Sequence, residues 1–288
     1  MKKNSFLANF YLFMVFFFLF APIVVMILFS FNEGRSTSVY EGFSLKWYGE
    51  LLANEAILEA IRNTLLLAVS SSIISTVLGT IAAYGINKFR SSSIRTTMMT
   101  ITQIPMINPE IITGFSFTLL FVFVGGLLHF SETFSFWTML IAHVTFSLPY
   151  VMLQIMPKLK QMDKSLPEAA MDLGCNPVQS FFKVELPEIM PGIVTGLIMA
   201  FTLSLDDFVI SYFTKGSGFA TLPILIYGEV RKSVKPDIYA LATVIFITVL
   251  IFLILFNVVS TDQNAKAKRQ AQREKVRARK NRVREDKS

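Results

Sequence analysis

The chain contains 288 residues, of which 53% are hydrophobic and only 16% are charged, a composition typical of polytopic membrane proteins. Its single cysteine, Cys175, excludes a framework of disulfide bonds. The net charge of +7 is an uneven average, because the basic residues are concentrated at the C-terminus.

Six apolar segments follow one another along the chain, and each is long enough for a membrane-spanning helix, which needs about 20 apolar residues. They are residues 4–32, 64–86, 96–128, 133–157, 189–213 and 238–260. The first follows Lys2 and Lys3, but it is too long for the apolar region of a signal peptide, so we predict a retained helix. The third is interrupted at Pro105 and Pro109. The sequence therefore predicts an all-α membrane protein with six transmembrane helices.

The distribution of Lys and Arg between the connecting segments predicts the orientation of the chain. One side receives 20 of these residues, from the N-terminus, residues 88–95, the loop 158–188 and the C-terminal tail, whereas the other side receives 7. Without the tail the counts are 9 and 7, so the tail dominates the asymmetry. We expect both termini and the loop 158–188 to be cytoplasmic.

Residues 1–260 are predicted to form one transmembrane domain, and residues 261–288 a cytoplasmic tail. The tail holds 11 Lys and Arg against 4 acids, so we expect it to be disordered or a solvated helix, with anionic membrane lipid as a further contact and no nucleic acid partner. On the opposite side, residues 33–62 and 215–237 are each predicted to carry a short helix. The second is a candidate contact for a binding protein outside the membrane, although plain connecting structure explains it equally well.

A polar stretch, EAAMDLGCNPVQSFFKVELP, separates the fourth and fifth apolar segments at residues 168–187. Pro167 suits the first turn of a helix, and Gly174 suits the left-handed residue that ends it. Asn176 and Pro177 then supply an N-cap and a first helical residue. We predict two short helices, with the following prolines marking the entry into the next apolar segment.

The spacing within this stretch resembles the EAA loop of ABC-importer permeases, in which Glu-Ala-Ala is followed by Gly and then by Ile-x-Leu-Pro. The matching residues are Glu168, Ala169, Ala170, Gly174, Leu186 and Pro187, with Val184 in the place of Ile. The resemblance implies that the loop docks on a cytosolic ATPase subunit, to which Glu168 offers a carboxylate. An ordinary amphipathic loop is the alternative. No P-loop occurs in the chain, so we expect no enzymatic activity, no bound cofactor and no metal, with ATP used by a partner subunit.

Three carboxylates, Glu110, Asp206 and Asp207, lie within apolar segments, where a charge is costly unless it faces a cavity or a partner. Along the predicted helix of residues 189–213, Asp207 belongs to a stripe of small and polar residues suited to lining a substrate path. Its members are Gly196, Ala200, Ser204, Asp207 and Ser211. We expect Asp207 to face the path, whereas Asp206 either shares it or bonds a neighbouring helix. His143 is expected to bond a neighbouring helix.

A path lined with acids favours a multiply charged organic cation and repels phosphate or sulfate. Residues 108–111, 142–149 and 201–208 resemble the spermidine/putrescine permeases of bacterial importers, of the PotC type. The resemblance covers most of the chain but not the basic tail, and Glu110 stands where that family is expected to have Asp. It implies a MetI-like helical domain in the bacterial cytoplasmic membrane. The implied partners are a homologous second permease, two ATPase copies and an extracytoplasmic polyamine-binding protein.

Other functions stay open on the sequence. The same fold could carry another cargo, such as ferric iron or thiamine. An ion-coupled secondary transporter would work alone, and it would have inverted internal repeats and no EAA loop. A membrane receptor or scaffold would show no transport at all.

Overall fold

The structure, a computed structural model, describes residues 5–34, 36, 39–129, 133–163, 165–232, 237–251 and 254. The chain forms two compact units. The terminal unit contains Met1–Ile61 and Leu222–Ile254, and the described part of the central unit is Arg62–Thr221. The basic tail predicted at residues 261–288 lies outside the described residues.

The terminal unit is helical. Its helices are α1 (Ser5–Ser30), α2 (Lys46–Ala53), the start of α3 (Glu55–Lys88), α11 (Leu222–Lys232) and an apolar helix at Asp237–Ile251. Trp47, Leu51 and Leu241 form the centre of its core. The indole Nε1 of Trp47 donates a hydrogen bond of 2.7 Å to the carbonyl of Asn32, which ties α2 to the segment that follows α1. The short helices predicted within residues 33–62 and 215–237 are confirmed as α2 and α11.

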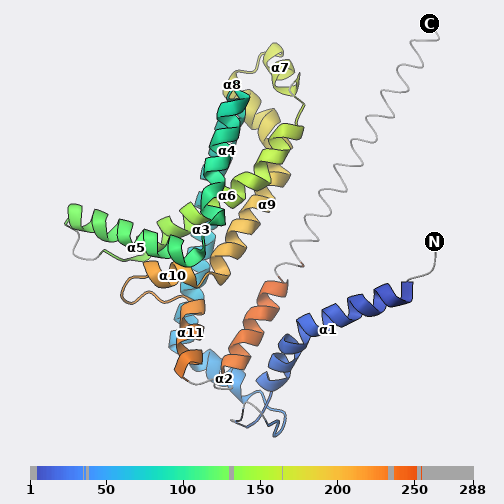
Figure 1. The fold of residues 1–288 in the computed structure, drawn as a ribbon, viewed down its shortest axis with the longest axis vertical. Helices are drawn as coiled ribbons and strands as arrows, with labels where there is room; N and C mark the ends of the chain where they lie inside the picture. Colours follow the sequence, from blue (N-terminus) through green and yellow to red (C-terminus); the bar gives the residue numbers. More distant parts are fainter. Residues whose placement is uncertain are drawn as a thin grey trace. The chain divides into compact units, whose positions relative to one another are not determined.

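The central unit contains the rest of α3 and the helices from α4 to α10, which are labelled on the ribbon (Figure 1). They are α4 (Ser92–Ile107), α5 (Glu110–Leu127), α6 (Phe136–Gln161), α7 (Ser165–Asp172), α8 (Pro177–Ser180), the π-helical turn η1 (Phe181–Glu185), α9 (Leu186–Asp206) and α10 (Val209–Thr214). All described elements beyond an isolated bridge between Asn32 and Phe43 are therefore helices.

The packing of α6 against α9 organises the central unit. Val151 and Ile155 of α6 are completely buried, as is Ile189 of α9. The two helices approach closely because α9 presents glycine to α6: a Cβ on Gly192 would lie 2.9 Å from the carbonyl oxygen of Gln154. Small residues at such contacts are how helices pack in lipid, where burial of apolar side chains gives little driving force between helices.

Five of the described helices are long and apolar enough to cross a membrane. They are Ala8–Ser30, Glu55–Lys88, Glu110–Leu127, Phe136–Gln161 and Pro177–Asp206. The fold is thus an all-α polytopic one. The sixth predicted span, residues 238–260, is represented by the shorter apolar helix Asp237–Ile251, and its remainder lies largely outside the described residues.

The structure refines one predicted span and corrects another. The predicted interruption of the third apolar segment is confirmed at Pro109, since the extended backbone of Asn108 and Pro109 separates α4 from α5, but Pro105 lies inside α4 and does not break it. The fifth segment is also not a single helix: α9 ends at Asp206, the backbone of Asp207 is extended, and α10 starts at Val209. This second break carries no proline or glycine and was not predicted.

Candidate functional site

The segment after α6, which we call the coupling segment (residues 165–185), has the predicted pair of helix turns. Gly174 follows α7 with a φ of 90°, a left-handed conformation that glycine adopts without strain. The side chain of Asn176 accepts a hydrogen bond of 2.8 Å from the backbone N–H of Gln179, whose side chain accepts one in return from the backbone N–H of Asn176. The capping role of Asn176, with Pro177 at the first helical position, is confirmed.

The start of the segment agrees with the prediction, whereas its end differs. Helix α7 begins at Ser165, where the carboxylate of Asp163 accepts from the backbone N–H of Ser165 at 3.0 Å, so Pro167 lies in the first turn. That hydrogen bond also holds the pKa of Asp163 below its usual range. The prolines do not separate the segment from the next span, since the helix continues through η1 into α9 with Pro187 in its first turn.

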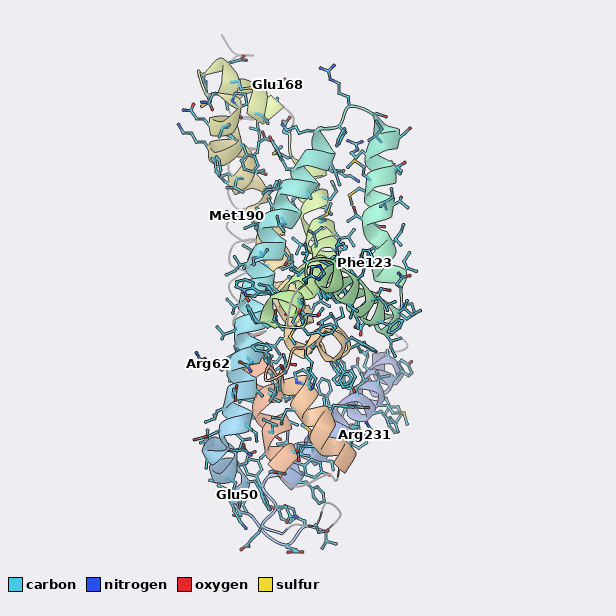
Figure 2. The ribbon with its side chains drawn as sticks, turned by 90° about the vertical axis from the view of Figure 1, so that its left-hand side faces the viewer. Glu50, Arg62, Phe123, Glu168, Met190 and Arg231 are labelled. Carbon is cyan, nitrogen blue, oxygen red and sulfur yellow. The ribbon has the colours of Figure 1, made fainter. Side chains whose placement is uncertain are left out.

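The motif residues divide between exposed and buried positions. Glu168, Ala169, Gly174 and Pro187 are exposed, Leu186 is half-buried, and Ala170 is buried. Ala170 therefore packs within the segment and leaves Ala169 as the small residue on its surface. Figure 2 shows Glu168 on the coupling segment, beyond the turn of α9 that carries Met190. Sequence reasoning missed that several apolar side chains beside the motif are also exposed: Leu166, Met171, Leu173, Val178 and Phe182.

A buried network of polar side chains lies where α9 gives way to α10. The ring of His143 in α6 is hydrogen-bonded through Nδ1 to the hydroxyl of Ser204 at 2.8 Å and through Nε2 to the hydroxyl of Ser211 at 2.9 Å. The hydroxyl of Ser71 in α3 donates to Ser204 at 2.9 Å. The predicted role of His143 as a link to a neighbouring helix is confirmed.

Asp207 belongs to this network. One carboxylate oxygen accepts from the backbone N–H of Ser211 at 2.8 Å and the other from that of Ile210 at 3.3 Å, so Asp207 caps the start of α10. The same carboxylate lies 3.5 Å from Nε2 of His143, and its side chain is 4% exposed. A buried carboxylate is stable in such a place because its oxygen atoms are satisfied by hydrogen-bond donors.

The stripe predicted on one helix face is therefore corrected. Ser204 and Ala200 are buried against the rest of the central unit, and a Cβ on Gly196 would lie 3.1 Å from a methyl group of Val151 in α6. Ser211 is completely buried, and Asp207 has left the helical register because α9 ends one residue before it. Within this chain, the stripe forms the contact between α9 and its neighbours rather than an open surface.

The other two acids have exposed side chains. Glu110 stands in the first turn of α5 and Asp206 in the last turn of α9. Their carboxylates lie close enough to interact electrostatically, and Glu110 also interacts with the half-buried Tyr150 of α6. Each of the two helix interruptions thus carries one acid with an exposed side chain.

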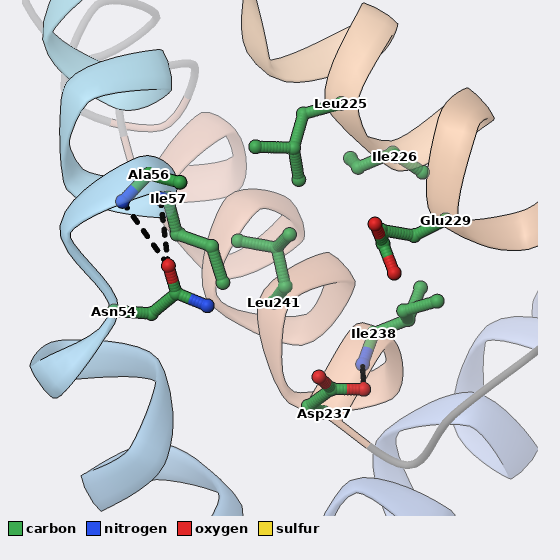
Figure 3. Close-up of a pocket in the computed structure, with 9 residues that line it drawn as sticks. All are labelled: Asn54, Ala56, Ile57, Leu225, Ile226, Glu229, Asp237, Ile238 and Leu241. Carbon is green, nitrogen blue, oxygen red and sulfur yellow. Dashed lines mark hydrogen bonds between the residues drawn. The ribbon is translucent and has the colours of Figure 1, made fainter.

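The terminal unit contains a cavity of about 260 Å³. Figure 3 shows the carboxylates of Glu229 and Asp237 and the amide of Asn54 around apolar side chains of Ile57 and Leu241. Two of these polar groups accept hydrogen bonds from backbone N–H groups. Asn54 Oδ1 accepts from the N–H of Ala56 at 3.1 Å, and Asp237 Oδ1 accepts from the N–H of Ile238 at 3.0 Å. Among the described residues, no group of three or more His, Cys, Asp or Glu side chains is arranged to hold a metal ion.

Comparison with known proteins decides the family. Residues 75–263 match the family described as the binding-protein-dependent transport system inner membrane component. This chain belongs to that family. The match includes the coupling segment, both acidic interruptions and the His143 network except Ser71. The family comprises the inner membrane components of such transport systems, so this chain is the permease and not the ATPase of its system, and its family is one that depends on a binding protein.

The permease has relatives whose transported compounds are named. It is 42% identical over 231 residues to the "Putrescine transport system permease protein PotI" of Escherichia coli (strain K12), a match that covers 79% of this chain and 81% of that protein. It is 33% identical over 262 residues to the "Spermidine/putrescine transport system permease protein PotC" of Haemophilus influenzae, which covers 91% of this chain and 99% of that protein. The predicted resemblance to permeases of the PotC type is confirmed.

A solved structure supports the fold. The permease aligns with a chain in the crystal structure of a bacterial alginate ABC transporter in complex with alginate pentasaccharide-bound periplasmic protein. The TM-score is 0.71 at 18% sequence identity, over 90% of this chain and 95% of that chain. The transmembrane fold of an ABC importer is therefore shown for this permease, in agreement with the sequence prediction.

Proposed function

We propose that this permease imports a polyamine, spermidine or putrescine, as one of two homologous permeases in an ATP-driven importer. The observation that carries the proposal is the pair of exposed acids, Glu110 and Asp206, at two helix interruptions in apolar segments. An acid that is exposed on a membrane-spanning segment needs a water-filled cavity or a partner of opposite charge. The names of the relatives at 42% and 33% identity point to the same cargo.

The substrate path, in this proposal, lies on the surface that Glu110 and Asp206 share and is completed by the second permease. A cation that has left bulk water gains attraction from both carboxylates, because charges interact more strongly away from water. Asp207, Ser204 and Ser211 support the path from behind: they fix α10 and α9 against His143 and so hold Asp206 in place. Length selection between spermidine and putrescine is left to the binding protein.

The coupling segment is proposed to dock on one of two cytosolic ATPase copies. Its surface combines the carboxylate of Glu168 with exposed apolar side chains, the largest exposed fraction being the 88% of Leu173. Such a surface fits a cleft that offers an apolar floor and an arginine. The exposed left-handed turn at Gly174 keeps the two short helices at an angle that a straight helix could not provide.

The topology follows from the same proposal. Six spans place both termini and the coupling segment in the cytoplasm of a bacterial cell, with residues 1–260 as the transmembrane domain and residues 261–288 as a basic tail beside anionic lipid. The segment with α11 and the cavity of Figure 3 then faces outward, where it is available to the extracytoplasmic polyamine-binding protein.

Uptake measurements test the proposal. Cells that lack other polyamine uptake and carry the complete importer with this chain are expected to accumulate radiolabelled spermidine or putrescine, and to stop when ATP is depleted. The same cells without this chain are the control. Uptake of ferric iron or thiamine instead would overturn the polyamine assignment, and polyamine uptake that survives ATP depletion would favour an ion-coupled transporter.

A further inference from the structure

The carboxylate of Glu185 lies at the inner end of the coupling segment and contacts α3. Its side chain is 3% exposed. The hydroxyl of Tyr84 donates a hydrogen bond of 3.0 Å to Oε1, and Nζ of Lys88 lies 3.4 Å from each carboxylate oxygen. Tyr84 and Lys88 are one helical turn apart, and Lys88 Nζ also stands 4.9 Å from the centre of the Tyr84 ring. We call these three residues the Glu185 cluster.

Hydrogen bonds and ring packing join the parts of the coupling segment, so we expect the segment to move as one unit. The buried hydroxyl of Ser180 donates to the carbonyl of Pro167 at 3.3 Å, which joins α8 to α7. The backbone N–H of Cys175 donates to the carbonyl of Ala170 at 3.1 Å across the turn. The ring of Phe181 packs edge-on against Tyr84 with the ring centres 4.6 Å apart, next to the Glu185 cluster.

The connections of the segment to the membrane helices are of two kinds. It follows α6 in the chain and continues directly into α9, so covalent bonds carry its movement to both. Helix α3 precedes it by more than 70 residues and has no such connection. The contacts of Tyr84 and Lys88 with Glu185 supply one.

The chemistry of Glu185 makes this a firm contact. A carboxylate removed from water needs its hydrogen-bond donors, and separating it from them is far more costly than breaking an exposed ion pair. Glu185 also ends the π-helical turn η1, a feature that often marks functional positions in helices. Movement of the coupling segment and movement of the end of α3 are therefore tied to each other.

We propose that the Glu185 cluster is the positioning element that makes α3 follow the coupling segment during the transport cycle. The inference rests on the proposed docking of this segment on an ATPase. It assigns to Tyr84, Lys88 and Glu185 a role in coupling that is separate from the docking surface around Glu168, because Glu185 is buried against α3 whereas Glu168 is exposed.

The test uses the assembled importer in proteoliposomes, with uptake and ATP hydrolysis measured together. Lys88→Glu places a like charge beside Glu185 and is expected to lower uptake per ATP hydrolysed by about tenfold, a typical size for the loss of a coupling interaction. Lys88→Arg keeps the charge and should retain the normal ratio. Arg90→Glu is the matched control, since it reverses an exposed base two residues from Lys88 and outside the coupling segment.

The exchanged pair Lys88→Glu with Glu185→Lys separates coupling from stability. It restores opposite charges, so uptake per ATP should rise well above that of Lys88→Glu alone. Should Lys88→Glu fail to assemble, Tyr84→Phe, which removes one donor and keeps the ring, is expected to lower the ratio by about threefold. A normal ratio in every assembled variant of the cluster would overturn the inference.

A distance measurement gives a second readout that does not depend on the cargo. Spin labels at Ile81→Cys in α3 and Asp172→Cys in α7, in a Cys175→Ser background, should keep one separation with ATP and with ADP. In Lys88→Glu the separation should differ between the two nucleotides. A wild-type complex whose ATPase is not stimulated by any binding protein would instead contradict the proposed function, whereas stimulation with an equal separation in both proteins would contradict the Glu185 cluster alone.

Discussion

The coupling segment and the His143 network are both polar interruptions of an apolar chain, yet they are built in opposite ways. The coupling segment is stabilised by neighbours in sequence, such as the reciprocal hydrogen bonds of Asn176 and Gln179. The His143 network joins residues far apart in the chain, Ser71, His143 and Ser204, each of which is buried. Both regions are polar, so polarity alone does not distinguish them. The exposed coupling segment can bind a partner, whereas the buried His143 network holds helices of the same chain together.

The two adjacent aspartates show the same contrast over a single peptide bond. Asp206 ends α9 with an exposed side chain, whereas Asp207 is buried against His143 and caps α10. If the contrast is correct, substitutions at the two positions should affect different properties.

Asp207→Ala should destabilise the permease most. It removes the acceptor for two backbone N–H groups of α10 and the partner of His143, with an expected loss of about 2–3 kcal/mol from uncapped and unsatisfied donors. The thermal midpoint of the purified complex in detergent measures it. Asp206→Ala is the control, and it should change the free energy of unfolding by no more than about 0.5 kcal/mol. If both variants lost the same free energy of unfolding, the buried Asp207 and the exposed Asp206 would not differ in their structural roles.

Glu168→Lys and Gly174→Asp should leave the protein inserted but disconnect uptake from ATP hydrolysis. The first reverses a charge on the proposed docking surface. The second places a side chain at a φ of 90°, where any residue other than glycine costs about 1 kcal/mol, and adds a negative charge. We expect uptake at equal membrane abundance to fall by at least about tenfold. Normal uptake by both variants would exclude the coupling segment from the mechanism.

Asp206→Asn and Glu110→Gln should reduce uptake per assembled complex without changing assembly. Each keeps the shape of the side chain and deletes one charge that attracts the cargo, so a decrease of about threefold to tenfold is expected. The decrease should be larger for spermidine than for putrescine, because spermidine carries more charge. Asp207→Asn, by contrast, is expected to lower the amount of assembled complex. Its uptake per assembled complex should change less than that of Asp206→Asn or Glu110→Gln. An unchanged ratio for both exposed acids would leave the polyamine assignment without support from the path.

Cysteine labelling tests the membrane topology of the permease, because each site either reacts in intact cells or does not. In a Cys175→Ser background, Ser217→Cys should react in intact cells with a thiol reagent that cannot cross the membrane. Native Cys175, which is partly exposed in the coupling segment, should react only after the cells are permeabilised. Reaction of Cys175 in intact cells would invert the topology.

Local signals explain what the sequence could predict. The caps at Gly174 and Asn176 act within a few residues, and the length of an apolar segment marks a membrane span, so the sequence alone predicts these features. The break after Asp206 could not be, because it depends on hydrogen bonds from α10 and on His143, which is more than 60 residues away. The predicted position of Asp207 on a helical face assumes 3.6 residues per turn. That assumption does not hold beyond Asp206, where α9 ends. The burial of Glu185 depends in the same way on Tyr84, a residue of another helix.

The cap on α10 has a consequence for how the protein is made. Helix α10 depends on a carboxylate that is favourable in an apolar environment only when His143 and the backbone donors are beside it. Domains form from the N-terminus as a chain is synthesised, and α6 precedes residues 207–214 in the sequence. His143 is therefore synthesised before Asp207. When Asp207 enters the bilayer, its hydrogen-bond partner in α6 is already there. A circular permutation that moved α6 behind α10 would preserve every contact of the finished protein, but it would deliver Asp207 to the lipid alone.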